Sequence, residues 1–153
     1  MKICAVILDY RGAEKTGKCL LSLVGQGIDT VLIVDNSADR RAGAALDNTV
    51  QDLRRSAPGY ELHVLRPAVN LGFARGVNLA LGHHAALACD AFLLLNNDAT
   101  AMPHMVSRLV DTLVERDADL VAPAIVDAGG RRQPMLWYQR FFGLLTAAPL
   151  PAS

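Results

Sequence analysis

Residues 90–98 read DAFLLLNND, and this stretch decides the fold. It begins with an apolar run that is too short for a helix and ends abruptly in Asn96, Asn97 and Asp98. Such a run predicts a strand that is buried on both faces inside a parallel sheet. Ligands of open α/β sheets bind outside the carboxyl ends of the strands, so the three polar side chains lie where a ligand is expected. Asp98 offers a hard oxygen ligand for Mg²⁺ or Mn²⁺, whereas the tripeptide taken alone is more typical of a turn before the next helix.

Two earlier strands are expected at residues 2–9 and 30–34, and each also runs into polar residues, DYRG and DNSAD. A short strand is expected at residues 62–65, and segments of helical periodicity follow the strands. The expected helices cover residues 14–24, 41–57 and 102–116, and a loop over residues 66–78 is expected to run into a further helix that extends to about Ala88. A last short strand is expected at residues 120–122. This alternation of strands and helices predicts an α/β fold with a largely parallel sheet.

Length and charge limit the classes of function. The 153 residues suffice for one domain with a real core, and 52% of them are hydrophobic. Lys and Arg together number 15, as do Asp and Glu, so no net field attracts the chain to nucleic acid or to an anionic membrane. The three cysteines lack metal-ligand spacing and suggest reduced core thiols in a cytosolic protein. No apolar stretch reaches the roughly 18 residues of a membrane span.

The segment from Asn70 to Asn78, NLGFARGVN, is expected to be a loop that runs into a helix. Its glycines, Gly72 and Gly76, allow the backbone to approach a ligand closely, and the free N–H groups at the helix start suit an anion. Taken alone, the same glycines indicate a turn and a close helix contact.

Aromatic residues gather near the end of the chain. Four of the eight aromatic residues lie within six positions, at Trp137, Tyr138, Phe141 and Phe142. A cluster this dense needs a surface to pack against. We slightly favour a terminal helix folded onto the sheet, and the alternative is an interface with another subunit or domain.

Taken together, four motifs resemble those of a known family: VILDYRG at residue 6, IVDNSAD at residue 33, NLGFARGVNLAL at residue 70 and FLLLNNDA at residue 92. Their order and spacing are similar to the nucleotide-sugar-binding half of family 2 glycosyltransferases, the inverting enzymes of the GT-A fold, and to the rhamnosyltransferase-like branch within them. The resemblance covers about residues 2–127. It implies a three-layer, open, mainly parallel sheet with helices on both faces.

The resemblance also implies roles for single residues. Asp35 would accept a hydrogen bond from the base of a UDP- or dTDP-sugar donor, and Asp98 would bind Mg²⁺ or Mn²⁺ at the diphosphate. The implied donor site is made of Tyr10, Asp35, Asn36, Asn70, Gly72, Phe73, Asn78 and Asn96. Without the resemblance, Asp35 is better explained as a helix cap, and Asn70 and Asn78 as turn and helix-surface residues.

The implied activity is transfer of the sugar, with inversion, to a hydroxyl of a saccharide or lipid-linked acceptor in polysaccharide biosynthesis. The setting would be the cytoplasm, with the acceptor at the inner membrane face. The catalytic base stays unknown, because no acidic residue follows Asp127. We therefore expect a donor-binding GT-A domain at residues 1–128 and a C-terminal segment at residues 129–153 that begins a missing acceptor half. Its aromatic residues favour a homodimer through this segment.

Two other functions stay open at this stage. A sugar nucleotidyltransferase needs a glycine- and lysine-rich phosphate loop after the first strand, and residues 9–14, DYRGAE, differ from such a loop. A non-catalytic nucleotide-sugar-binding or interaction domain would keep the fold and use the aromatic tail for a partner. Binding of a nucleotide separates a pure interaction domain from the other functions.

Overall fold

The computed structural model describes residues 1–56, 58–127, 129–132, 136–141 and 144–149, with the backbone alone described from residue 136 onward. The chain divides into two compact units, residues 1–111 and residues 112–153. The expected domain boundary at residue 128 stays a prediction. In chain order the elements are β1 Ile3–Asp9, α1 Ala13–Ser22, β2 Thr30–Asp35, α2 Arg40–Arg55, β3 Glu61–Leu65, α3 Gly72–Leu81, α4 His84–Leu87, β4 Ala91–Asn96, α5 Met105–Glu115, β5 Leu136–Phe141 and β6 Leu144–Pro149.

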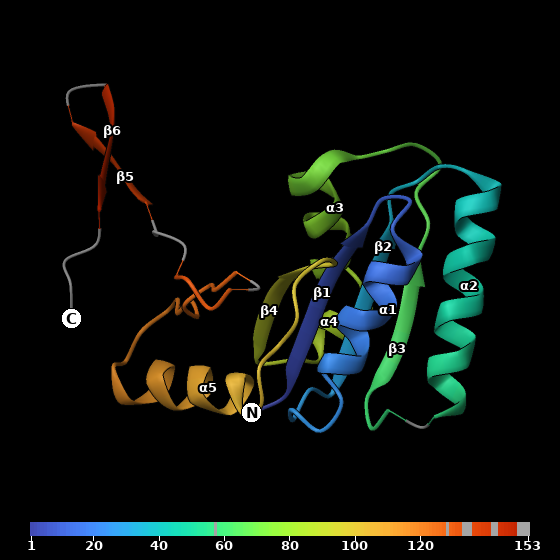
Figure 1. Ribbon diagram of the computed structural model, residues 1–153, viewed down its shortest axis with the longest axis horizontal. Helices are drawn as coiled ribbons and strands as arrows, with labels where there is room; N and C mark the ends of the chain where they lie inside the picture. The colour runs from blue at the N-terminus through green and yellow to red at the C-terminus, as the bar shows by residue number, and fades with distance from the viewer. Residues whose placement is uncertain (57, 128, 133–135, 142–143, 150–153) are drawn as a thin grey trace. The chain divides into compact units, whose positions relative to one another are not determined.

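A four-stranded parallel sheet in the order β3-β2-β1-β4 forms the centre of the first unit. Parallel neighbours need crossover connections, and the helices between consecutive strands supply them. Helices α1 and α2 lie on one face of the sheet, while α3 and α4 lie on the other (Figure 1). The predicted three-layer α/β fold with helices on both faces is therefore confirmed.

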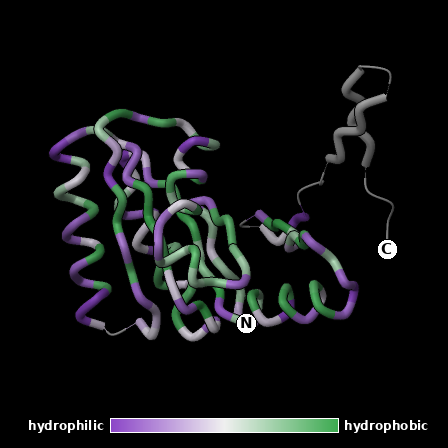
Figure 2. The backbone as a smooth tube through the Cα atoms, turned by 180° about the vertical axis from the view of Figure 1, so that it is seen from behind, coloured by the Kyte–Doolittle hydropathy of each residue, from purple (hydrophilic) through white to green (hydrophobic). Residues whose placement is uncertain are grey.

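Alternate side chains of the inner strands supply the two cores. On β1, Ile3, Ala5 and Ile7 pack with α1 and α2, whereas Cys4 and Val6 pack with α3 and α4. This alternation follows from the two-residue repeat of a strand. The strands of the sheet are largely apolar, while α2 alternates between polar and apolar residues (Figure 2). Helix α2 needs only one apolar stripe because its other face meets water.

Strand β4 departs from the prediction. It pairs with β1 at the edge of the sheet, and its side chains alternate between half-buried and exposed. Leu93 and Leu95 pack against the core beneath α1 and α2, but Phe92 is 45% exposed and Leu94 51% exposed. The expectation of burial on both faces is wrong because α3 and α4 pack over β1 and β2 and leave this face of β4 open.

Three other expected elements also differ. The single helix expected to extend to about Ala88 is broken into α3 and α4, because α3 ends at Gly82 and the Nδ1 atom of His83 accepts the Ala85 N–H to start α4. Residues 120–125 form no strand, and Leu120 is 85% exposed. Pro123 lacks the N–H that a strand ladder requires.

The C-terminal helix is replaced by an antiparallel hairpin of β5 and β6, with Leu136 opposite Pro149. Trp, Tyr and Phe favour strands over helices, which explains this correction. The side chains of residues 133–153 lie outside the described part of the structure, and with them the expected dimer contact through the aromatic segment. Within the described residues, no helix has both the length and the apolar character needed to cross a membrane.

Candidate functional site

The carboxyl ends of three strands meet at one edge of the sheet. In the parallel register, Asp9 on β1 lies opposite Asp35 on β2, and Leu8 on β1 lies opposite Asn96 on β4. The backbone N–H of Asn36 donates to the Asp9 carbonyl across 2.8 Å, which joins two of these ends directly. The polar clusters that the sequence places after three separate strands are therefore neighbours at the edge where α/β ligands bind.

Asp35 is held in a charged network. Its side chain is only 5% exposed, its Oδ2 atom lies 3.2 Å from Nε of Arg66, and its Oδ1 atom accepts the Ser37 N–H across 3.1 Å. The other end of the Arg66 guanidinium donates to exposed Asp47 across 2.6 Å. Gly43 packs beside the pair, because a Cβ there would lie 3.4 Å from Oδ2 of Asp35 and 3.8 Å from Nε of Arg66, which are ordinary contact distances. Asp35 therefore caps no helix, and the sequence reasoning missed its partner Arg66.

Asn36 holds the loop that precedes α3. Its amide nitrogen donates to the Gly72 carbonyl across 3.0 Å, and its amide oxygen accepts the Leu71 N–H across 2.9 Å. Asn70 closes a local turn by accepting the Gly72 N–H across 2.8 Å. Gly72 has a φ of 71°, a left-handed conformation that glycine adopts without steric cost. The side chains of Asn36 and Asn70 thus shape the loop, and their hydrogen bonds engage the Leu71 N–H, the Gly72 N–H and the Gly72 carbonyl.

The remaining predicted donor-site side chains lie on the surface. Tyr10 is 57% exposed and Phe73 is 62% exposed, and Asn78 is also exposed on α3. Gly76 serves packing, because a Cβ at this position would lie 2.9 Å from Cδ2 of Leu8. The two exposed aromatic rings are available for stacking or apolar contact with a ligand.

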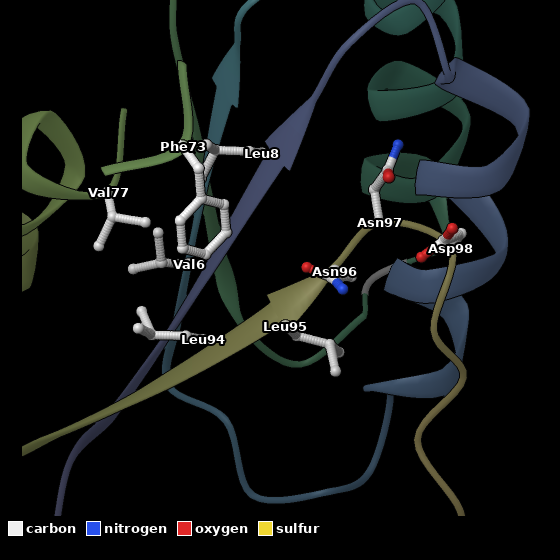
Figure 3. Close-up of a pocket in the computed structure, with 9 residues that line it drawn as sticks. All are labelled: Val6, Leu8, Phe73, Val77, Leu94, Leu95, Asn96, Asn97 and Asp98. Carbon is white, nitrogen blue, oxygen red and sulfur yellow. The ribbon is translucent and has the colours of Figure 1, made fainter. Parts of the chain in front are cut away.

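A cavity of about 210 Å³ opens beside the end of β4 (Figure 3). It is smaller than the roughly 300–1,000 Å³ of typical small-molecule sites, so it accommodates only part of a ligand of that size. Asn96 lies on the side of β4 toward Phe73, whereas Asn97 and Asp98 lie toward α1 (Figure 3). The lining combines an apolar wall with a polar end and is made of Val6, Leu8, Phe73, Val77, Leu94, Leu95, Asn96, Asn97 and Asp98.

A buried polar cluster, which the sequence reasoning missed, lies behind the Asn96–Asp98 turn. Asp9 is 1% exposed, and its Oδ1 atom accepts hydrogen bonds from the Thr16 hydroxyl at 2.5 Å and from the Asn97 amide at 3.3 Å. The same amide lies 3.1 Å from the Thr16 hydroxyl oxygen. The available signal in the sequence was Thr16, a polar residue in the first turn of α1 on the face that also carries Cys19 and Leu20. Thr16 is fully buried.

Comparison with family models decides which family this arrangement represents. The model described as glycosyl transferase family 2 matches residues 4–151, which is nearly the whole chain. The chain belongs to glycosyl transferase family 2. This family membership implies glycosyltransferase activity with a nucleotide-sugar donor and an acceptor, which agrees with the polar edge of the sheet. A search of curated proteins found no match.

The oxygen donors present limit what metal this family 2 domain can hold. Among the described residues, no three His, Cys, Asp or Glu side chains gather closely enough to bind an ion on their own. At the end of β4 the available groups are the carboxylate of exposed Asp98 and the amide oxygen of Asn96. Mg²⁺ needs only one or two carboxylates when substrate phosphates fill other positions, so these residues fit an ion that arrives with its nucleotide.

Asp98 also affects a neighbouring thiol. Burial raises the pKa of Cys19 to about 12, and the negative charge of Asp98 contributes to this increase. Cys19 lies on α1, so its response to Asp98 agrees with the position of that carboxylate on the α1 side of the turn. Cys19 stays protonated at neutral pH and is unsuited to act as a nucleophile or thiolate ligand.

Proposed function

We propose that this edge of the sheet binds a UDP- or dTDP-sugar and that the sugar is transferred, with inversion, to a hydroxyl of a saccharide or lipid-linked acceptor. The proposal places the protein in the rhamnosyltransferase-like branch of the family and in cytoplasmic polysaccharide biosynthesis. The observation that carries it is the register that brings the ends of β1, β2 and β4 together beside the cavity.

Asp35 provides base selectivity in this proposal. A carboxylate only accepts hydrogen bonds, and each of its oxygens has two lone pairs. Asp35 uses one position on Oδ1 for Ser37 and one on Oδ2 for Arg66, so capacity remains for the N3–H of uracil or thymine. Cytosine presents an acceptor at this position and is disfavoured. The exposed ring of Tyr10 is the candidate stacking partner for the base.

Asp98, with Asn96 beside it, is proposed to hold Mg²⁺ or Mn²⁺ at the diphosphate. When bound, the ion supplies Lewis-acid stabilisation of the negative charge that develops on the departing diphosphate. The loop that Asn36 holds at Leu71 and Gly72 is proposed to line the space for the ribose and phosphates. With a neutral amide at position 96, the protein binds the ion weakly unless the nucleotide is present.

The general base that would deprotonate the acceptor hydroxyl is left unassigned. Inversion requires a base within hydrogen-bond reach of the attacking hydroxyl. Asp127 is a poor candidate, because its Oδ1 atom accepts the N–H groups of Gly129 and Arg131 at 2.9 Å each and thereby closes a turn.

A thermal-shift panel tests the proposed donor. UDP, dTDP, CDP, GDP and ADP, each with Mn²⁺ and with chelator, are compared at equal concentration. A ligand that binds the folded state raises the melting temperature by mass action. We expect the largest increase for UDP or dTDP with Mn²⁺. Equal shifts for all five nucleotides would refute base selection by Asp35, and the lack of any shift would refute the donor site.

A further inference from the structure

The buried carboxylate of Asp9 has a definite set of partners. Oδ1 accepts from the Thr16 hydroxyl and from the Asn97 amide, while Oδ2 lies 3.4 Å from the Gly12 nitrogen. All three partners are neutral donors. Asp9 is therefore a buried carboxylate whose hydrogen-bonding groups come from α1 and from the turn after β4.

The position of Asp9 next to a helix end also suits a carboxyl group. It lies beside the N-terminus of α1, a helix of 10 residues whose first N–H groups carry partial positive charge. The Asn97 amide nitrogen lies 3.3 Å from Oδ1 of Asp9 and 3.1 Å from the Thr16 hydroxyl oxygen, so two contacts hold the Asn97 side chain in place. Asn97 is the member that is covalently adjacent to Asp98.

The backbone provides independent support for this close attachment. A Cβ atom at position 12 would lie only 2.7 Å from the Asn97 amide nitrogen and 3.4 Å from Oδ1 of Asp9. The Asn97 amide therefore occupies space that only glycine at position 12 leaves free.

We propose that Asp9 is a positioning residue for the metal-binding turn Asn96–Asp98, and that it acts through Thr16 and Asn97. The amide of Asn97 is held on the α1 side of the turn, which fixes the backbone of the residue that immediately precedes Asp98. The same contact explains the neutral residue at position 97, because a carboxylate there would face the buried carboxylate of Asp9 without a cation between them. This inference rests on the proposed binding of metal and nucleotide at Asp98.

The first test removes the hydroxyl at the centre of the cluster. Thr16→Val keeps the β-branched shape but removes the bonds to both Asp9 and Asn97, and Thr16→Ser keeps the hydroxyl as the matched control. For each protein, calorimetry measures the dissociation constant of UDP with Mn²⁺ and with chelator. Substitution of residues that orient metal ligands typically weakens metal binding by about 10–100-fold. We expect Thr16→Val to reduce by about tenfold the gain in UDP affinity that Mn²⁺ produces, and to keep the UDP affinity in chelator within about twofold of the wild-type value. Thr16→Ser is expected to bind as the wild type does in both buffers.

The second test relocates the charge and uses the metal-free protein. Asn97→Asp alone is expected to lower the melting temperature, because it places two carboxylates together. The double variant Asp9→Asn/Asn97→Asp restores a donor opposite an acceptor and is expected to recover most of that loss. Equal melting temperatures for the single and double variants would overturn the inference.

The outcomes separate this inference from the proposed function. A wild-type protein whose UDP affinity is the same in Mn²⁺ and chelator overturns the metal site and this inference together. A wild-type protein with a clear Mn²⁺ effect that Thr16→Val retains in full overturns only the positioning role of Asp9. Loss of melting temperature in Thr16→Val with an unchanged Mn²⁺ effect likewise assigns the cluster to stability alone and overturns the inference.

Discussion

Replacement of Asp35 by alanine is expected to reduce both stability and nucleotide affinity. The substitution removes the acceptor of the buried Ser37 N–H and one partner of Arg66, and the side chain that is lost is only 5% exposed. A buried donor that is left unsatisfied costs about 1–3 kcal/mol. For a chain of about 150 residues each kcal/mol lowers the melting temperature by roughly 2–4 °C, so we expect a decrease of about 2–12 °C.

The same carboxylate is the proposed acceptor of the base N3–H. A hydrogen bond to a charged group is worth about 1.5–3 kcal/mol, which corresponds to a roughly 10–150-fold weaker dissociation constant for UDP. The matched control is Asp47→Ala, which removes the other acidic partner of Arg66 at a site where the Asp47 side chain is 60% exposed. An exposed ion pair contributes about 0–1 kcal/mol, so this control should alter stability little and UDP binding less.

Calorimetric titration of UDP in the presence of Mn²⁺ decides the outcome, at a temperature at which circular dichroism shows every variant to be folded. A folded Asp35→Ala protein with wild-type affinity would refute base recognition by Asp35. Equal losses of affinity in both variants would instead assign the effect to Arg66.

Three further predictions concern the surroundings of the site. Gly12→Ala should lower the free energy of unfolding by about 1–3 kcal/mol in chemical denaturation, because its Cβ would meet the Asn97 amide at 2.7 Å. The control Gly82→Ala should lower it less, because a Cβ at that position meets only carbonyl oxygens at 3.5 and 3.8 Å. Equal losses in the two variants would contradict the close contact between position 12 and Asn97. Burial and the neighbouring His84 and His63 lower the pKa of His83, with Glu61 opposing them, so the folded state binds this proton less readily than the unfolded state. The melting temperature should therefore fall as the pH decreases below about 6.5. His83→Asn keeps a capping acceptor and should weaken this pH dependence, and an unchanged pH profile would exclude His83 as its source. Burial raises the pKa of Cys4 and Cys19 to about 12, so the less buried Cys89 should react first with iodoacetamide at pH 8, and mass-spectrometric labelling of Cys4 or Cys19 ahead of it would contradict the packing.

The parallel sheet and its polar edge were predictable from the sequence because both depend on local patterns. Apolar runs that stop at DYRG, DNSAD and NND mark strand ends, and parallel strands place those ends at one edge. Periodicity could not show which strand is the outermost. Leu94 follows the same apolar pattern as the buried residues of β1, yet it is exposed because β4 has one described neighbour and no helix above that face.

Contacts between distant residues account for most of the site that was missed. Asp9 and Asn97 are 88 positions apart, and no local pattern pairs a strand-end carboxylate with an amide at that distance. Arg66 lies 31 positions from Asp35, and no local pattern pairs these two residues. The C-terminal hairpin was missed for another reason, since a short aromatic cluster is compatible with a helix or a strand until a partner strand is known.

A metal-dependent donor site at Asp98 is tested by a calorimetric titration of UDP into the wild-type chain and into Asp98→Asn, each with Mn²⁺ and with chelator. Loss of one charge-assisted contact is worth about 1.5–3 kcal/mol, so we expect chelator to weaken UDP binding to the wild type by about tenfold or more. Asp98→Asn should bind UDP with nearly the same affinity in both buffers, close to that of the wild type in chelator. A wild-type affinity that is identical in Mn²⁺ and in chelator, or an Asp98→Asn protein that keeps the full Mn²⁺ effect, would contradict a metal-dependent donor site at the end of β4.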